Sequence, residues 1–199
     1  MLYKVVSLIF KIVFGILFRP KVIGKENVPQ QGAMIMAANH MSNWDPPIAG
    51  TYLPRPVAYM AKEELFQNPI SKVILPQMYA FPVKRGAADR AAIKTALGIL
   101  KQGLCLGVFP EGTRSKDGKL HKPEAGVALL AAMGKAPVIP TALIGTNKIF
   151  HNGSWFPQLQ IIFGEPIYFE GKHNDKAALE EFSKKIMKKI EIVINLHSK

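Results

Sequence analysis

One cysteine and few acidic residues are the clearest shortages in this chain of 199 residues. The single cysteine, Cys105, excludes an internal disulfide and argues against a zinc-thiolate site, and this usage suits a reducing compartment. Only 14 aspartates and glutamates stand against 26 lysines and arginines, so the formal net charge is +12. Such an excess favours an anionic partner: nucleic acid, a phosphorylated small molecule, an acidic protein or an anionic membrane surface.

Features typical of nucleic-acid-binding and metal-binding proteins are also missing from the sequence. Aromatic residues make up 9% of the chain but form no platform for stacking bases, and no helix-turn-helix or RNA-recognition pattern is present. Apart from His40 the histidines are scattered, and no local cluster of His and Asp has the spacing of metal ligands. We therefore expect no nucleic-acid partner and no metal.

Residues 1–19 are apolar except for Lys4, Ser7, Lys11 and Gly15, with Arg19 at their end. At 100° per residue these four positions fall on one narrow stripe, which predicts an amphipathic helix with a dominant apolar face. A helix that crosses a bilayer needs about 20 largely uncharged residues, and Lys11 lies in the middle of this segment. We expect an interfacial, monotopic helix whose cations face anionic lipid.

Two other interpretations of residues 1–19 compete with this one. A secretory signal peptide needs a small-residue cleavage site, and the sequence GILFRPKVIG offers none. The helix could also simply cover the core of the protein. The expected organisation is an interfacial helix over residues 1–19 followed by one domain over residues 20–199.

Residues 20–199 alternate between apolar runs typical of buried strands and segments with helical spacing of apolar residues. The expected strands lie within 21–32, 33–39, 57–63, 79–83, 104–109, 136–145 and 158–167. The expected helices begin at Pro46 with Asp45 as the N-cap and lie within 65–78, 89–101, 123–134 and the last segment, around 179–193. This alternation predicts an α/β protein, a single layered domain with a mostly parallel or mixed sheet flanked by helices.

Four polar loops, at 40–45, 62–64, 84–90 and 111–114, each follow one of the apolar runs. In α/β folds the functional residues gather in the loops that leave the strand ends. Three of these loops contain cations. If the four converge, they form a basic site with one histidine–carboxylate pair.

His40 and Asp45 lie at the two ends of the polar stretch in NHMSNWD, residues 39–45. Imidazole is the natural general base near neutral pH, and a carboxylate bound to one ring nitrogen leaves the other free to take a proton. No serine lies in a nucleophile-elbow pattern, so the base is expected to activate a hydroxyl of the substrate. Alternatively, Asp45 merely caps a helix and His40 merely closes a strand.

The other three loops offer groups that suit a phosphate. In FPEGTRS, residues 109–115, Gly112 permits a close backbone approach, Thr113 supplies a hydroxyl and Arg114 supplies a planar donor fork. This loop lacks the glycine and lysine spacing of a Walker A motif. Arg85 and Lys62 could add to the same positive field, although each loop could equally be a solvated turn.

Together these segments resemble the glycerophospholipid acyltransferase superfamily, and within it the bacterial 1-acylglycerol-3-phosphate O-acyltransferases. The histidine and aspartate of the family's first motif match NHMSNWD, the arginine of the second matches FPVKRG, and the third motif matches FPEGTRS without departure. The fourth, a hydrophobic stretch around a proline, matches VIPTALIG. The resemblance runs in the expected order from about residue 20 to 170. Some members of the family carry a longer N-terminal membrane element than residues 1–19.

The resemblance implies a role for each matched residue. His40 would deprotonate the free hydroxyl of a lysophosphatidic acid, Asp45 would orient the imidazole, and the alkoxide would attack an acyl thioester with no acyl-enzyme. The phosphate would be held by Arg85, Arg114 and Lys62, and the loop around the glycerol would be shaped by Glu111, Gly112 and Thr113.

The resemblance also implies partners and a location. No cofactor is expected beyond the donor substrate, which is acyl-coenzyme A or an acyl carrier protein. The protein is expected on the cytoplasmic face of the cell membrane as a peripheral protein of phospholipid biosynthesis. Two alternatives stay open: glycerol 3-phosphate or another lysophospholipid as the acceptor, and a peripheral phospholipid-binding protein without catalysis.

Overall fold

The structure, a computed structural model, describes residues 2–84, 89–151 and 155–198. Its strands are β1 Lys21–Ile23, β2 Met34–Ala38, β3 Val57–Lys62, β4 Ala80–Val83, β5 Cys105–Val108, β6 Val138–Ile144 and β7 Gln160–Phe163. Its helices are α1 Leu2–Phe18, α2 Asp45–Tyr52, α3 Pro69–Gln77, α4 Arg90–Lys101, α5 Gly126–Gly134 and α6 Lys176–His197. Short 3-10 helices are η1 Lys25–Asn27, η2 Glu63–Phe66 and η3 Thr146–Lys148.

The strands form one mixed sheet in the order β1-β7-β6-β2-β5-β3-β4. Each neighbouring pair from β6 to β4 is parallel, and β7 alone pairs antiparallel with its neighbour β6 in the described part of the chain. The expected α/β class and mostly parallel sheet are confirmed. Because β2, β5, β3 and β4 are parallel neighbours, their carboxyl ends meet at one edge of the sheet.

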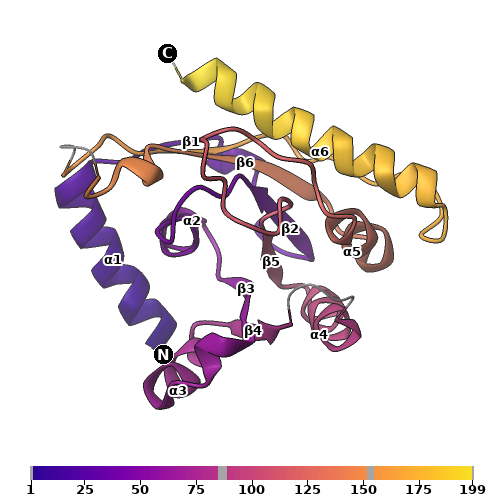
Figure 1. The fold of residues 1–199 in the computed structure, drawn as a ribbon, viewed down its shortest axis with the longest axis horizontal. Coiled ribbons are helices and arrows are strands. Elements are labelled where there is room, and N and C mark those ends of the chain that lie inside the picture. The colour runs from indigo at the N-terminus through magenta and orange to yellow at the C-terminus, as the bar shows by residue number, and fades with distance from the viewer. Residues whose placement is uncertain (1, 85–88, 152–154, 199) are drawn as a thin grey trace.

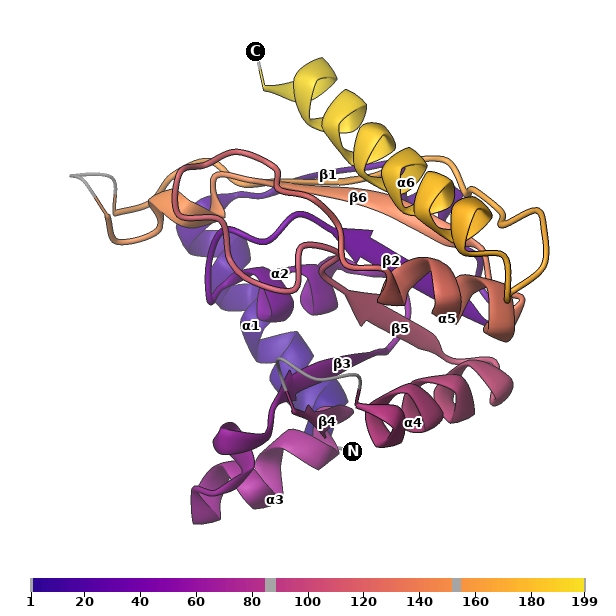
Figure 2. The same cartoon turned by 45° about the vertical axis from the view of Figure 1, so that its right-hand side comes forward.

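Alternate residues of the central strand β2 face opposite sides of the sheet. Met34, Met36 and Ala38 pack in one core with Phe14 of α1 and Ile48 of α2. Ile35 and Ala37 pack in the other core with residues of α4, α5 and α6. Figures 1 and 2 show α1 and α2 on one side of the sheet and α4, α5 and α6 on the other.

Helix α1 has two apolar faces with different surroundings. Phe14 and Phe18 are buried in the core, whereas Leu8, Ile12 and Ile16 are exposed. The expected helix over residues 1–19 is therefore present, and it covers the core while it also presents an apolar outer face. Among the described residues, no helix combines the length and the apolar character that crossing a bilayer requires.

Helix α6 follows the apolar stripe that the sequence predicts, with Phe182, Ile186 and Ile190 buried against the sheet. It starts at Lys176, where the Asp175 side chain accepts hydrogen bonds from the backbone N–H groups of Ala177 and Ala178. A side chain of this kind satisfies donors that a helix start leaves unpaired. The helix is therefore longer than its apolar stripe alone indicates.

Candidate active site

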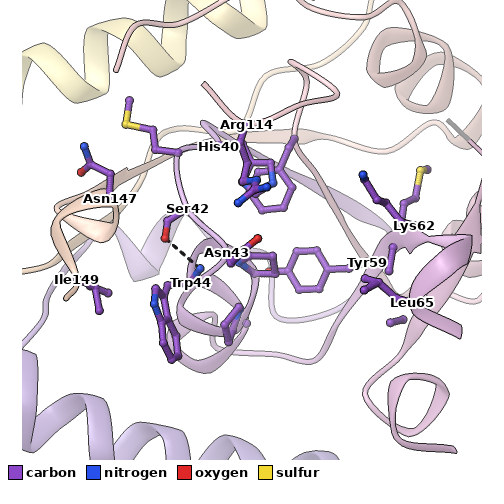
Figure 3. Close-up of a pocket in the computed structure, with 18 of the residues that line it drawn as sticks. His40, Ser42, Asn43, Trp44, Tyr59, Lys62, Leu65, Arg114, Asn147 and Ile149 are labelled. Atoms are coloured by element: carbon purple, nitrogen blue, oxygen red, sulfur yellow. Dashed lines mark hydrogen bonds between the residues drawn. The ribbon is translucent and has the colours of Figure 1, made fainter. Parts of the chain in front are cut away.

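A cleft of about 1110 Å³ lies where β2, β5 and β3 end. Among the residues that line it are His40, Lys62, Thr113 and Arg114. Figure 3 shows His40 and Arg114 on one side of this cleft and Lys62 on the other. The parallel order of the strands thus brings together predicted residues from three loops.

His40 and Asp45 form a buried pair. The His40 Nδ1 atom lies 2.8 Å from Asp45 Oδ2, and the same oxygen accepts hydrogen bonds from the backbone N–H groups of Met41 and Ser42 at 2.7 Å each. An ionised carboxylate can only accept, so Nδ1 carries the proton and the neutral ring has its lone pair on Nε2. No described residue is hydrogen-bonded to Nε2, and His40 lines the cleft.

The expected role of Asp45 as a helix N-cap is wrong. Trp44 occupies the N-cap position of α2 without a side-chain cap, and Asp45 is the first residue of the helix. Its carboxylate points back toward residues 40–42, because two backbone N–H groups of that turn and the imidazole converge on it. The functional interpretation of the pair is the one that agrees with this geometry.

Aromatic packing fixes the plane of the His40 ring. The ring stacks on Phe109 with a centroid distance of 4.1 Å and an interplanar angle of 20°, and Tyr59 also stacks with Phe109 at 6.1 Å. Gly107 makes room for Tyr59, because a Cβ at this position would lie 2.3 Å from the tyrosine ring. Sequence reasoning missed this stack; its signal is the glycine inside the apolar strand before Phe109.

The backbone of His40 is held by the loop that follows β5. Its N–H donates to Glu111 Oε1 at 3.2 Å, and its carbonyl accepts from the Ser115 N–H at 2.8 Å. The other oxygen of Glu111 accepts from the backbone N–H of His121 at 3.1 Å. The buried Glu111 carboxylate therefore joins the backbone of His40 to the backbone of His121, further along this loop.

Glu111 and Gly112, both predicted to bind substrate, are not among the described residues that line the cleft. Gly112 has a positive φ of 68°, and a Cβ there would meet the Glu124 side chain at 3.1 Å. The glycine thus allows a left-handed turn. Thr113 and Arg114, which follow it, are the residues of this motif that reach the cleft with Ser115.

The loop after Ser115 is organised around Asp117. The backbone N–H of Lys119 donates to its carboxylate at 3.1 Å, the Ser115 hydroxyl donates at 2.9 Å, and the His121 Nε2 atom lies 3.0 Å away. These contacts, the Lys119 N–H first, lower the pKa of Asp117 to about 2. The carboxylate is therefore ionised near neutral pH and holds the loop that carries Lys116 into the cleft.

Three cations, Lys62, Arg114 and Lys116, line the cleft, and the described lining contains no carboxylate. Sequence reasoning did not single out Lys116. Arg85, the predicted phosphate ligand after β4, lies outside the described residues. The described cations alone, from both sides of the cleft (Figure 3), give it a positive potential that suits an anion.

Another part of the cleft is apolar. It is lined by Tyr3 and Phe10 of α1 and by Leu65, Leu75 and Met78, which lie in or beside η2 and α3. A cleft with a cationic part and an apolar part fits a ligand that combines a phosphate with a hydrocarbon chain. Within the described residues, no group of three His, Cys, Asp or Glu side chains is placed to hold a metal ion.

One buried residue beside the site was also missed. The Asn39 amide donates to the Leu143 carbonyl at 2.9 Å and accepts from the Leu143 N–H at 2.8 Å. These two bonds tie the end of β2 to β6, immediately before His40. The signal in the sequence is a polar residue at the end of an otherwise apolar strand.

Comparison with known proteins gives consistent results. The profile of a family described as "Acyltransferase" matches residues 19–144. The 1-acyl-sn-glycerol-3-phosphate acyltransferase of Bacillus subtilis (strain 168) is 36% identical over 172 residues, which cover 84% of this chain and 83% of that protein. The enzyme of the same name from Borreliella burgdorferi is 30% identical over 131 residues, covering 65% of this chain and 52% of its own.

A solved structure is similar over almost the whole chain. The crystal structure of PlsC, the 1-acyl-sn-glycerophosphate (LPA) acyltransferase of Thermotoga maritima, superposes with a TM-score of 0.77 at 26% sequence identity. The similarity covers 99% of this chain and 81% of that one. The shared fold therefore includes α1 as well as the sheet and its loops.

Proposed function

This chain belongs to the acyltransferase family, and from that membership we propose that it transfers an acyl chain from an acyl thioester to the free hydroxyl of 1-acylglycerol 3-phosphate. The product is phosphatidic acid, an intermediate of phospholipid biosynthesis. The observation that carries the proposal is the His40–Asp45 pair, whose Nε2 atom faces a cleft lined by cations.

The geometry supports a direct transfer. Nε2 of His40 takes the proton of the acceptor hydroxyl while the oxygen attacks the carbonyl carbon of the thioester. The carbon–sulfur bond breaks, and the leaving thiolate takes the proton back from the imidazolium. Asp45 holds the ring in the required tautomer and stabilises its positive charge between the two proton transfers. No serine or cysteine nucleophile is needed, and Cys105 is buried in the sheet.

The acceptor phosphate is assigned to Lys62 and Arg114, whose charges line the cleft that His40 faces. Arginine offers two parallel donors to a phosphate, and lysine adds a point charge. Thr113 can donate its hydroxyl to the glycerol or the phosphate. Arg85 stays a predicted ligand of the same phosphate.

Glu111 is assigned a positioning role in place of a direct contact with the acceptor. Its two carboxylate oxygens already accept from the backbone N–H groups of His40 and His121. Gly112 supports the same role, because its left-handed conformation lets the chain turn from Glu111 to Thr113. Both residues therefore act on the reaction through the placement of their neighbours.

The donor, the partners and the location are part of the proposal. The cations around the cleft suit the phosphates of acyl-coenzyme A and the acidic surface of an acyl carrier protein. Residues 1–19 serve as a monotopic contact with an anionic membrane, and residues 20–199 form the catalytic domain. The protein works on the cytoplasmic face of the cell membrane, where acyl thioesters are available, and uses no cofactor.

The proposal is tested by the release of free thiol from palmitoyl-coenzyme A and from palmitoyl-acyl carrier protein, with and without 1-acylglycerol 3-phosphate. We expect release only with the acceptor. His40→Ala should lower the rate about 10²- to 10⁴-fold, the range for loss of a general base. His173→Ala, a change of an exposed histidine, should leave the rate unchanged.

Two results would contradict the proposal. No acceptor-dependent release by the wild-type protein with either donor would exclude this activity. Full activity of His40→Ala, with a circular dichroism spectrum like that of wild type, would remove His40 from the role of base.

A further inference from the structure

Helix α3 exposes most of its apolar side chains. Ile70, Val73 and Ile74 are 69%, 62% and 42% exposed, and no residue of this helix is buried. These apolar side chains therefore do not contribute to the protein core. Contiguous exposed apolar surface on a protein typically marks a site of contact with another molecule or with a membrane.

Helix α3 lies beside the first turn of α1 (Figures 1 and 2). The rings of Tyr3 in α1 and Tyr79 after α3 pack edge to face at 5.2 Å, and Figures 1 and 2 both show α3 next to the first turns of α1. Tyr3, Leu75 and Met78 also line the same cleft. The two exposed helices therefore border one entrance to the apolar part of the cleft.

Two exposed aromatic side chains lie near the other end of α1. Trp155 and Phe156 are exposed, and the Phe156 ring lies 6.1 Å from that of Phe18. Tryptophan and phenylalanine at such positions are typical of proteins that rest at the membrane–water interface.

The charges on α1 and α3 themselves favour an anionic bilayer over a neutral or acidic protein partner. Neither α1 nor α3 contains an aspartate or glutamate, and Lys4, Lys11 and Lys72 are exposed on them. By contrast, α6 exposes the apolar residues Ile192 and Leu196 on a helix that also contains three glutamates. Basic residues next to apolar ones attract a helix to anionic headgroups and let its apolar face enter the interface.

We propose that α3 is a second membrane-docking element, which places Ile70, Val73 and Ile74 in the interface of an anionic bilayer beside α1. This inference rests on the proposed function, because a lipid acceptor needs a route from the bilayer to His40. With both helices docked, the cleft between them opens onto lipid. The acyl chain of the acceptor then enters the apolar part of the cleft while its phosphate meets the cations.

The test compares two double variants of the full-length protein in sedimentation with vesicles of phosphatidylcholine and phosphatidylglycerol in equal parts. Ile70→Ser with Val73→Ser removes the proposed contact. Ile192→Ser with Leu196→Ser is the matched control, because Leu196 is 69% exposed and Ile192 is 41% exposed on α6. We expect the α3 variant to bind vesicles about tenfold more weakly than wild type, and the control to bind like wild type.

A second measurement separates this inference from the proposed function. Acyl transfer to a short-chain, water-soluble 1-acylglycerol 3-phosphate reports on the active site without vesicles, and the α3 variant should retain it. If wild type transfers no acyl chain, the proposed function fails, while vesicle binding still reports on α3.

Three outcomes would overturn the role of α3. The α3 variant could bind vesicles as tightly as wild type, or the α6 control could lose as much binding as the α3 variant. In the absence of lipid, sedimentation velocity could show a wild-type dimer that the α3 change abolishes. In that last case a second copy of the chain covers this helix.

Discussion

Replacing Glu111 with glutamine separates a positioning role for this residue from a substrate-binding role. The carboxylate accepts one hydrogen bond on each oxygen, from the backbone N–H groups of His40 and His121. Glutamine has nearly the same shape but offers only one acceptor oxygen. Its NH₂ group must face one of the two N–H groups, which then lies in a buried place without an acceptor.

The expected magnitude follows from these contacts. A buried donor left without a partner costs about 1–3 kcal/mol, so the free energy of unfolding should fall by that amount. The backbone of His40 then keeps the bond from Ser115 but loses or strains the one to residue 111. Since a displacement of about 1 Å at a catalytic group can cost roughly 10²-fold, we expect kcat to fall about 10- to 100-fold.

The assay is thiol release as a function of acceptor concentration at saturating donor, together with urea unfolding. The KM for the acceptor should change less than about threefold, because a residue that only positions the base does not bind the ground state. Glu124→Gln is the matched control, because it makes the same change at an exposed residue of the same loop. A raised KM with an unchanged kcat would refute the positioning role and indicate that Glu111 binds the substrate.

Two further substitutions and one chemical modification test other parts of the protein. Arg114→Ala should raise the KM for 1-acylglycerol 3-phosphate about 10- to 100-fold through loss of a charge-assisted hydrogen bond, and an unchanged KM would remove Arg114 from the phosphate site. The pKa of Asp117 is lowered to about 2, whereas an aspartate in an unfolded chain has a pKa of about 4. Its carboxylate therefore stabilises the fold fully above about pH 4, and this stabilisation is lost as the pH falls toward 2. The difference in urea midpoint between wild type and Asp117→Asn should therefore shrink over that range, and a constant difference would contradict the assignment. Burial raises the pKa of Cys105 to about 12, so its thiol should resist a disulfide reagent at about pH 8 until the protein is unfolded.

The positions of the strands and the meeting of their loops could be predicted from the sequence. Apolar runs followed by polar loops indicate strands whose carboxyl ends share an edge, and His40, Lys62 and Arg114 do line one cleft. The order of the strands could not be predicted. That β7 pairs antiparallel with β6 and parallel with β1 depends on packing between segments far apart in the chain.

The roles of the two buried carboxylates were harder to assign for the same reason. An aspartate directly before Pro46 has the pattern of a helix cap, and only the three-dimensional path of residues 40–42 shows that Asp45 faces them instead. Glu111 lies in the motif FPEGTRS, in which Thr113 and Arg114 line the cleft. Its partners, His40 and His121, are 71 and 10 residues away in the chain, so no local pattern reveals that its carboxylate turns inward.

The connection from β3 to β4 links the proposed chemistry to the proposed membrane contact. It leaves the sheet at Lys62, passes through η2, forms α3 and returns at Ala80. Lys62, Leu65, Leu75 and Ala80 all line the cleft, whereas Ile70 and Val73 in between face outward. A single crossover therefore supplies the cation that we propose for the phosphate, part of the apolar wall and the exposed face of α3. These groups lie on one short segment, so the depth at which α3 docks also sets the height of Lys62 above the lipid surface. In the proposed arrangement the headgroup of a lipid acceptor meets this cation while its chain enters the apolar part of the cleft.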